Sequence, residues 1–510
     1  MRPSRRSFAA YLASGLTGGL FRPLEGALRS PSKLLILLIA EQFRPDYLDR
    51  TESRLGNAGF RRLLNEAAYF PDCRFVASTF TASGLATLAS GAWPGMHGIV
   101  ADSWYDRAMR QAVAAQAPLL ESTTLAESLP PGRSRAYVLA LDEAQAGILA
   151  GSSPAQTFWM DDKGQFTVSD APPSWLAEFN RLHPLENLHN ARWLAVGAGS
   201  NVPPLRTLTY DAAHPRDFLL LFRASPLSQA AQFELLRELI ARERLAQTDA
   251  FDFVAVSLGA MGLLGYEVGA DSPLMDQMVL QLDRQIEFTL DTLNKSVGAG
   301  NYTLVFTGAH GAPPEPDEAS RPAMAIAGEA VARGVNRGLA QFYDGPGEER
   351  WYVEKYIYPF VYLRQEELRR RNLDLRQART LAGQAALQVP GVAGYYTADD
   401  FSSQRGDWLA RFRNSFHAVR SGDLMLSYFP EFVEDFGAGR GVSYGSLYNY
   451  DARVPLFLYG PPFRAATFEH AVEAVDVAPT LARCCRFPEP SSSTGRVLEE
   501  ALAEEPARTR

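Results

Sequence analysis

The sequence predicts an α/β protein with a mostly parallel central sheet packed between helices. Several apolar runs have the length of a strand and show no alternation of polar residues, which is typical of strands buried on both faces. An amphipathic segment of helical period lies between two of these runs, as in a strand–helix–strand unit. The chain has 510 residues and 46% hydrophobic content, so it can bury a large core.

The first apolar run is KLLILLIA at residues 33–40, directly after Pro and Ser residues that punctuate the chain. Similar runs recur at 251–258 (FDFVAVSL), 302–306 (YTLVF) and 454–459 (VPLFLY). Each predicts a strand of the central sheet.

A helix is predicted over residues 273–295, between the second and third runs. Its apolar residues recur at intervals of three and four, at 275, 279, 282, 286, 290 and 293. Ligands of open parallel sheets bind outside the carboxyl ends of the strands. We therefore expect the chemistry in the loops that follow Ala40, Leu258 and Phe306.

The segment over about 105–245 differs from the rest of the chain. It is rich in Pro, Ala and Gly, and its aromatic residues are scattered with weak periodicity. We predict one α/β domain over residues 31–505, with this segment as an insertion that caps the sheet.

The charge balance excludes one class of partner. The formal net charge is -8 and no basic cluster stands out, which argues against nucleic-acid binding. The three cysteines, Cys73, Cys484 and Cys485, are too few and too badly spaced for a disulfide framework or a metal knuckle. We expect them to be small buried residues.

Residues 1–30 are predicted to be an export signal. Arg2, Arg5 and Arg6 precede a modestly apolar run, and the stretch SRRSF resembles the twin-arginine pattern of folded bacterial exports. The run is too short to span a bilayer, and no later segment reaches that length. The expected location is therefore periplasmic or exported.

Four stretches at the predicted strand ends together resemble the alkaline phosphatase superfamily, in its type I phosphodiesterase/nucleotide pyrophosphatase branch with a threonine nucleophile. They are LIAEQFRPDYLDR at 38–50, STFTASGLATLASGAWPGMHGIVADSWYDR at 78–107, VSLGAMGLLGYEVGADSP at 256–273 and GNYTLVFTGAHGAPPEP at 300–316. Further segments match in order as far as residue 502. The resemblance implies the same α/β fold.

The resemblance also implies a two-zinc centre, because active members bind two zinc ions through Asp, His and the nucleophile. The nucleophile position is Thr81, and the first Asp position holds Glu41. Of an Asp-His pair only His310 remains, beside Ala309. The other donor positions fall on Gly262, Tyr266 and Tyr444. Since a phenol with a pKa of about 10 is a poor zinc ligand, we expect that this centre does not assemble.

The phosphate-binding positions implied by the resemblance have changed as well. A phosphate-contacting Asn falls on Asp102, and a Lys and an Arg fall on Asp142 and Ala144. Carboxylates at these positions would repel a phosphate dianion. We therefore expect the pocket to disfavour phosphate.

Three hypotheses follow. The first is a pseudoenzyme whose pocket binds an unknown small molecule or protein partner, or has only a structural role, without a cofactor. The second is a phosphoric ester hydrolase with a rebuilt site, in which Thr81 is the nucleophile and Glu41, His310 and Asp102 bind one divalent cation such as Mg²⁺ or Ca²⁺. The third is a protein that binds a cation or a cationic ligand in the acidic pocket.

Overall fold

The computed structural model describes residues 32–199, 201–314, 324–345, 350–402, 406–430, 432–435 and 444–503. The predicted export signal, residues 1–30, lies outside the described residues. Within the described chain, no helix is both long enough and apolar enough to cross a membrane.

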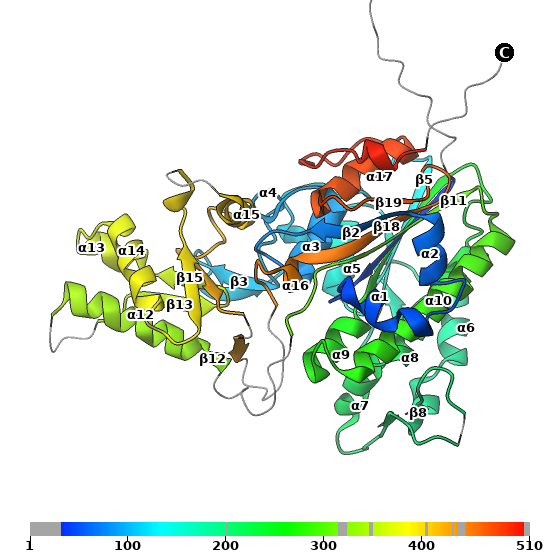
Figure 1. The fold of residues 1–510 in the computed structure, drawn as a ribbon, viewed down its shortest axis with the longest axis horizontal. Coiled ribbons are helices and arrows are strands. Elements are labelled where there is room, and N and C mark those ends of the chain that lie inside the picture. The colour runs from blue at the N-terminus through cyan, green and yellow to red at the C-terminus, as the bar shows by residue number, and fades with distance from the viewer. Residues whose placement is uncertain are drawn as a thin grey trace, which may run out of the picture.

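A ten-stranded mixed sheet forms the centre of the larger lobe, at the right of Figure 1. Its strands follow the order β19-β2-β18-β11-β1-β10-β5-β6-β7, and β20 pairs with β2. The bounds are β1 Leu34–Ala40, β2 Ala68–Arg74, β5 Ser134–Leu139, β6 Gln156–Met160, β7 Phe166–Val168, β10 Phe251–Leu258, β11 Tyr302–Gly308, β18 Arg453–Tyr459, β19 Ala466–Thr467 and β20 Val472–Glu473.

The middle of this sheet is parallel, as predicted. Strand β1 pairs in parallel with both β10 and β11, and β10 pairs in parallel with β5. The predicted run at 454–459 is β18, which pairs antiparallel with β11. An apolar run predicts burial but does not encode direction, so only the structure shows this reversal.

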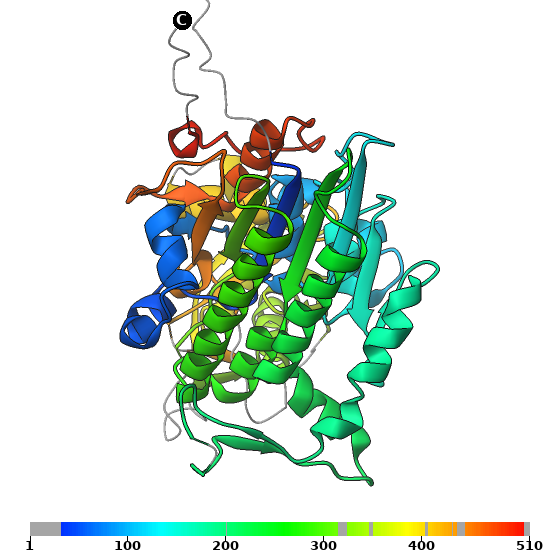
Figure 2. The same ribbon diagram turned by 90° about the vertical axis from the view of Figure 1, so that its right-hand side faces the viewer.

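Helices cover both faces of the sheet, and this explains why β1 is apolar throughout. Leu35, Leu37 and Ile39 belong to the hydrophobic core on one face, whereas Leu34 and Ile36 belong to the core on the other. The first core includes residues of α3 Thr81–Ser90, α5 Glu143–Ala150 and α17 Val477–Cys485. The second includes residues of α2 Phe60–Glu66, α8 Pro226–Arg242 and α10 Pro273–Ser296, of which α8 and α10 run along the front of the sheet in Figure 2.

The prediction of a cap over about 105–245 is wrong in part. Strands β5, β6 and β7 fall in this range and belong to the central sheet. The aromatic residues that looked scattered pack in its core, where Phe158 of β6 stacks on Trp175 at 5.9 Å between ring centroids. These strands are short and buried, so they leave little periodicity in the sequence. The same range also holds α6 Ser174–Leu182, α7 Pro215–Arg223, and the small sheets β3 Ser103–Asp106 with β4 Gln111–Ala114 and β8 Ala191–Trp193 with β9 Arg206–Leu208.

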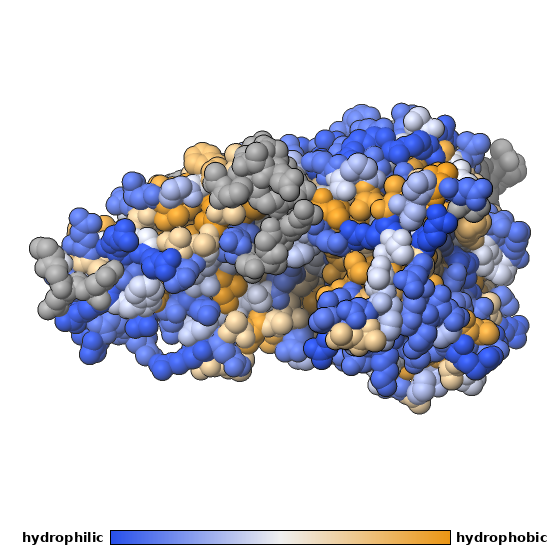
Figure 3. Space-filling model, turned by 90° about the horizontal axis from the view of Figure 1, so that it is seen from below, coloured by the Kyte–Doolittle hydropathy of each residue, from blue (hydrophilic) through white to orange (hydrophobic). Residues whose placement is uncertain are grey.

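A second, smaller lobe is built from residues that follow β11, at the left of Figure 1. Its four-stranded sheet has the order β13-β14-β16-β15. The elements are β12 Ala325–Ala327, α12 Gly328–Tyr343, β13 Val353–Ile357, β14 Phe360–Leu363, α13 Gln365–Arg370, α14 Leu375–Ala386, β15 Val392–Tyr396, α15 Asp407–Ser415, β16 Leu424–Tyr428 and β17 Val433–Asp435. Seen from below, hydrophilic residues cover the outer ends of both lobes and hydrophobic ones gather toward the middle (Figure 3).

Candidate functional site

The carboxyl ends of three central strands lie level with one another. In the sheet register, Ala40 of β1 stands opposite Leu258 of β10 and Gly308 of β11. Glu41 follows β1 directly, and His310 lies two residues after β11. The helix α9 Ala260–Val268 begins just after β10. The loops expected to hold the chemistry therefore meet at one edge of the sheet.

Thr81 and His310 form a hydrogen-bonded pair at this edge. Thr81 is the first residue of α3, and its Oγ1 lies 3.0 Å from Nε2 of the buried His310. The other ring nitrogen, Nδ1, lies 2.6 Å from the carbonyl oxygen of Gly311. Because a carbonyl only accepts, the ring proton is on Nδ1, and Nε2 accepts from the Thr81 hydroxyl. Burial lowers the pKa of His310 to about 4, so its ring is neutral at pH 7.

Glu41 is buried beside this pair and is held by an amide. Gln145 donates from Nε2 to Oε1 of Glu41 at 2.6 Å, and its own Oε1 accepts from the hydroxyl of Ser257 at 2.9 Å. Burial first, and then the nearby charges of Asp102 and Asp142, raise the pKa of Glu41 to about 8. Glu41 is therefore mostly protonated at pH 7.

Gly262 gives Glu41 the space that it occupies. A Cβ added at Gly262 would lie 2.0 Å from Oε2 of Glu41, well inside van der Waals contact. A side chain at position 262 and the present Glu41 conformer therefore exclude each other. The loss of an acid at 262 and the longer acid at 41 are two parts of one packing arrangement.

Asp102 occupies the start of α3. Its Oδ1 accepts from the backbone N–H of Ala82 at 2.8 Å, and its Oδ2 accepts from the hydroxyl of Tyr444 at 3.3 Å. The first N–H groups of a helix attract anions. Here a carboxylate of the chain itself takes one of these groups, at the position where the resemblance implies a phosphate contact.

Tyr444 packs against the histidine. The ring centroids of Tyr444 and His310 are 4.3 Å apart, and the Phe80 ring lies 6.0 Å away on another side. Burial raises the pKa of Tyr444 well above its ordinary value, so the phenol is neutral. Tyr444 thus fills space beside His310 and hydrogen-bonds Asp102.

Three predicted positions lie at the margin of this cluster. Asp142 is exposed and accepts from the N–H of Gln145 at 3.2 Å, so it caps α5. Ala309 is buried, and its N–H donates to the carbonyl oxygen of Ala40 at 3.0 Å. Tyr266 of α9 is half-buried and, among the described residues, makes no hydrogen bond or ring contact with the cluster.

Sequence reasoning missed Gln145 and Ser257, which orient Glu41. Ser257 lies in a strand and Gln145 in the first turn of α5, more than a hundred residues away. No spacing in the sequence marks such a pair. Proximity to Asp142, which was predicted as a pocket residue, is the one signal that pointed toward this helix.

The residues of this edge do not fit two zinc ions. Gly262 and Ala309 have no donor atom, Tyr444 is a neutral phenol, and Glu41 holds a proton at pH 7. The one imidazole present already accepts from Thr81. Within the described part of the chain, no group of three or more His, Cys, Asp or Glu side chains is placed to hold a metal ion. Zinc needs about three anionic or imidazole donors for each ion.

A mostly parallel α/β sheet with a buried threonine at a helix start beside its carboxyl edge is an arrangement found in hydrolase folds. The family model of type I phosphodiesterase / nucleotide pyrophosphatase matches residues 35–428. The chain belongs to this family, and through it to the alkaline phosphatase superfamily.

Curated relatives and solved structures agree with this assignment. Alkaline phosphatase PafA of Elizabethkingia meningoseptica is 23% identical over 98% of this chain and 100% of its own length. Alkaline phosphatase PhoV of Synechococcus elongatus is 22% identical over 92% of this chain and 93% of its own. The crystal structure of wild-type PafA superposes with a TM-score of 0.82 at 22% identity, covering 93% of this chain and 99% of that one. At this identity the superposition establishes the shared fold.

Proposed function

We propose that this chain is a pseudoenzyme of the phosphodiesterase family: it keeps the hydrolase fold but does not assemble the two-zinc centre, and its site has a binding or structural role. The observation that carries the proposal is Asp102, whose carboxylate binds the N–H of Ala82 at the start of α3. A phosphate ester would have to displace this carboxylate and would find no cation among the residues of the cluster. Oε1 of Glu41 accepts from Gln145 and the Tyr444 hydroxyl donates to Asp102, and these contacts within the chain support a self-contained site.

The proposal is tested with the purified full-length chain, a phosphomonoester and a phosphodiester of 4-nitrophenol, and added Zn²⁺ or Mg²⁺. The matched control is T81A, which removes only the hydroxyl at the nucleophile position. We expect wild-type and T81A preparations to release nitrophenol at the same background rate. If the wild type hydrolysed either ester above background and T81A did not, the proposal would be overturned.

A second candidate is a phosphoric ester hydrolase that uses Thr81, and one observation favours it. His310 is positioned to accept the Thr81 proton, as a general base does for a hydroxyl nucleophile. The relatives named alkaline phosphatases also support hydrolysis rather than its loss. In this candidate His310 would act as the base instead of as a cation ligand, so one divalent cation would bind at Glu41 and Asp102 alone, after Glu41 loses its proton.

The two candidates differ in what the variants T81A and H310A do to hydrolysis. If His310 acts as the base, hydrolysis depends on its neutral form, and its pKa of about 4 makes this contribution constant from pH 5 to 8. The variants T81A and H310A would then both lose activity. Activity that survives in H310A would exclude this role for the histidine.

We also propose export through the twin-arginine pathway, supported by Arg5 and Arg6 near the start of the chain. Replacing both by Lys in a bacterial host should leave the protein in the cytoplasm, since the pathway reads the arginine pair. Fractionation that finds the double variant in the periplasm would contradict this location.

A further inference from the structure

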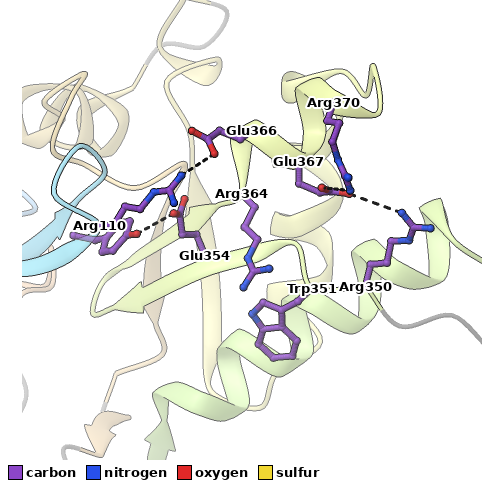
Figure 4. Close-up of a pocket in the computed structure, with 9 residues that line it drawn as sticks. Arg110, Arg350, Trp351, Glu354, Arg364, Glu366, Glu367 and Arg370 are labelled. Atoms are coloured by element: carbon purple, nitrogen blue, oxygen red, sulfur yellow. Dashed lines mark hydrogen bonds and ion pairs between the residues drawn. The ribbon is translucent and has the colours of Figure 1, made fainter.

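A second cavity lies in the smaller lobe, and none of its lining residues belongs to the cluster around Thr81. It has a volume of about 810 Å³ and is lined from β3 and the turn after it, from β13 and the segment before it, from Arg364 directly after β14, and from α13 (Figure 4). This volume is in the range of pockets that bind small organic molecules. Four arginines and three glutamates line it, together with Trp351 and Tyr105.

The three glutamates of this cavity already have partners. Glu366 pairs with Arg110 at 2.9 Å, and Glu367 pairs with Arg370 at 2.6 Å. Glu354 accepts from the hydroxyl of Tyr105 at 2.9 Å. Their negative charges are therefore compensated or hydrogen-bonded inside the cavity wall.

Arg364 differs from these residues. Its side chain is exposed and, within the described chain, its guanidinium makes no ion pair or hydrogen bond. Its backbone is fixed, because it follows the fully buried strand β14 and its N–H donates to the carbonyl oxygen of Tyr352 at 2.8 Å. In Figure 4 the guanidinium projects into the open space of the cavity, on the side where Trp351 lies.

Trp351 is the second unsatisfied feature of the cavity. Its side chain is 40% exposed, and among the described residues it has no ring contact. An indole exposed in a cavity offers a flat apolar face on which a ring can stack. A flat apolar surface and a free guanidinium thus face one cavity.

We propose that this cavity binds a small anionic ligand that carries an aromatic or similarly flat ring. Arg364 binds the anionic group, because a guanidinium presents parallel donors that match a carboxylate or a phosphate. Trp351 stacks on the ring. The cavity has one more arginine than it has glutamates, which favours an anion over a cation. The proposal does not depend on whether the Thr81 site is catalytic.

The test uses phenylphosphonate, a probe that phosphatases cannot hydrolyse, and follows Trp fluorescence and calorimetry on the full-length protein. We expect saturable binding at millimolar concentration or below, and at least a tenfold loss in R364Q. In W351A the binding of phenylphosphonate should weaken, while the binding of methylphosphonate should not change. Only the phenyl ring stacks on the indole. Benzoate in parallel tells whether a carboxylate or a phosphonate is preferred.

The control R369Q changes an exposed arginine of α13 that does not line the cavity, and it should bind as the wild type does. T81A should also bind normally, which places the probe away from the cluster at α3. Circular dichroism checks that each variant is folded. The proposal would be overturned if neutral benzamide bound as tightly as the anionic probes, or if no probe bound at all. Loss of binding in T81A or unchanged binding in R364Q would also overturn it.

Discussion

At the scale of single residues, the site is explained by side chains that exclude or satisfy one another. Glu41 lies where a side chain at Gly262 would lie, and Asp102 binds the N–H that would face a phosphate. Glu41, Asp102 and Tyr444 each have at least one hydrogen-bond partner within the chain.

The packing of Glu41 against Gly262 predicts a non-additive effect. G262A should destabilise the protein by about 1–3 kcal/mol, because its Cβ meets the Glu41 carboxyl. In an E41A background the same substitution should cost less, because the 2.0 Å contact with Oε2 is gone and only the contact with the Cβ of residue 41, at 2.8 Å, remains. Chemical unfolding of the four proteins measures both values.

The control for this cycle is G147A in α5, where an added Cβ would lie 3.4 Å from the Cβ of Ala117, an ordinary contact. The effect of G147A on stability should be the same whether residue 41 is Glu or Ala. Equal effects of G262A in both backgrounds would refute the coupling.

The sequence predicted the site in part. Glu41 and His310 were expected near one sheet edge because they follow strand ends, and Thr81 was expected there because of the family resemblance; the structure brings Thr81 and His310 into hydrogen-bond contact beside the buried Glu41. The capping of α3 by Asp102 was not predictable, because it depends on how a loop folds back over twenty residues. The protonation of Glu41 was not predictable either, because it results from burial.

At the scale of elements, Asp423 joins parts that are distant in the chain. Its carboxylate accepts from Arg107 at 2.8 Å, from Arg379 at 3.2 Å and from the N–H of Leu363 at 2.8 Å, and its side chain is fully buried. It thereby connects the end of β3 with β14 and α14.

D423A should destabilise the protein by at least about 3 kcal/mol, because it leaves buried guanidinium and amide donors without an acceptor. The control is E366Q, which breaks an exposed ion pair and should cost less than about 1 kcal/mol. Thermal unfolding compares the two. A D423A protein as stable as E366Q would show that this carboxylate does not hold the lobe together.

Glu434 makes a pH-dependent contribution to the stability of the smaller lobe. It lies on β17 and accepts from the phenols of Tyr356 and Tyr428 at 2.8 and 2.6 Å. Burial raises its pKa from 4.5 to about 7 despite these hydrogen bonds, and the charge of Asp435 raises it further. Between pH 4.5 and about 7, Glu434 holds a proton in the folded chain that it releases in the unfolded chain.

This contribution is therefore complete below pH 4.5 and is lost as the pH rises through about 7, on the order of 3 kcal/mol in total. E434Q keeps an acceptor for both phenols but cannot titrate. Relative to E434Q, the wild type should lose stability between pH 5 and 8 in urea unfolding. A constant difference over this range would contradict the assigned pKa.

At the scale of the whole molecule, most of the larger lobe was predictable. The helix expected at 273–295 is α10 Pro273–Ser296, and the four apolar runs are β1, β10, β11 and β18. The smaller lobe was missed because its four-stranded sheet is antiparallel and its strands are short, so it shows no long apolar run. The chain thus has the fold of its family over both lobes.

The central claim is that this edge does not assemble a two-zinc centre, and the zinc content of the purified full-length protein tests it most directly. The protein is prepared without chelator, equilibrated with zinc and dialysed, and its zinc is measured by mass spectrometry. We predict well below one zinc ion per chain, and no change in T81A. Two zinc ions per chain that survive dialysis would contradict the account.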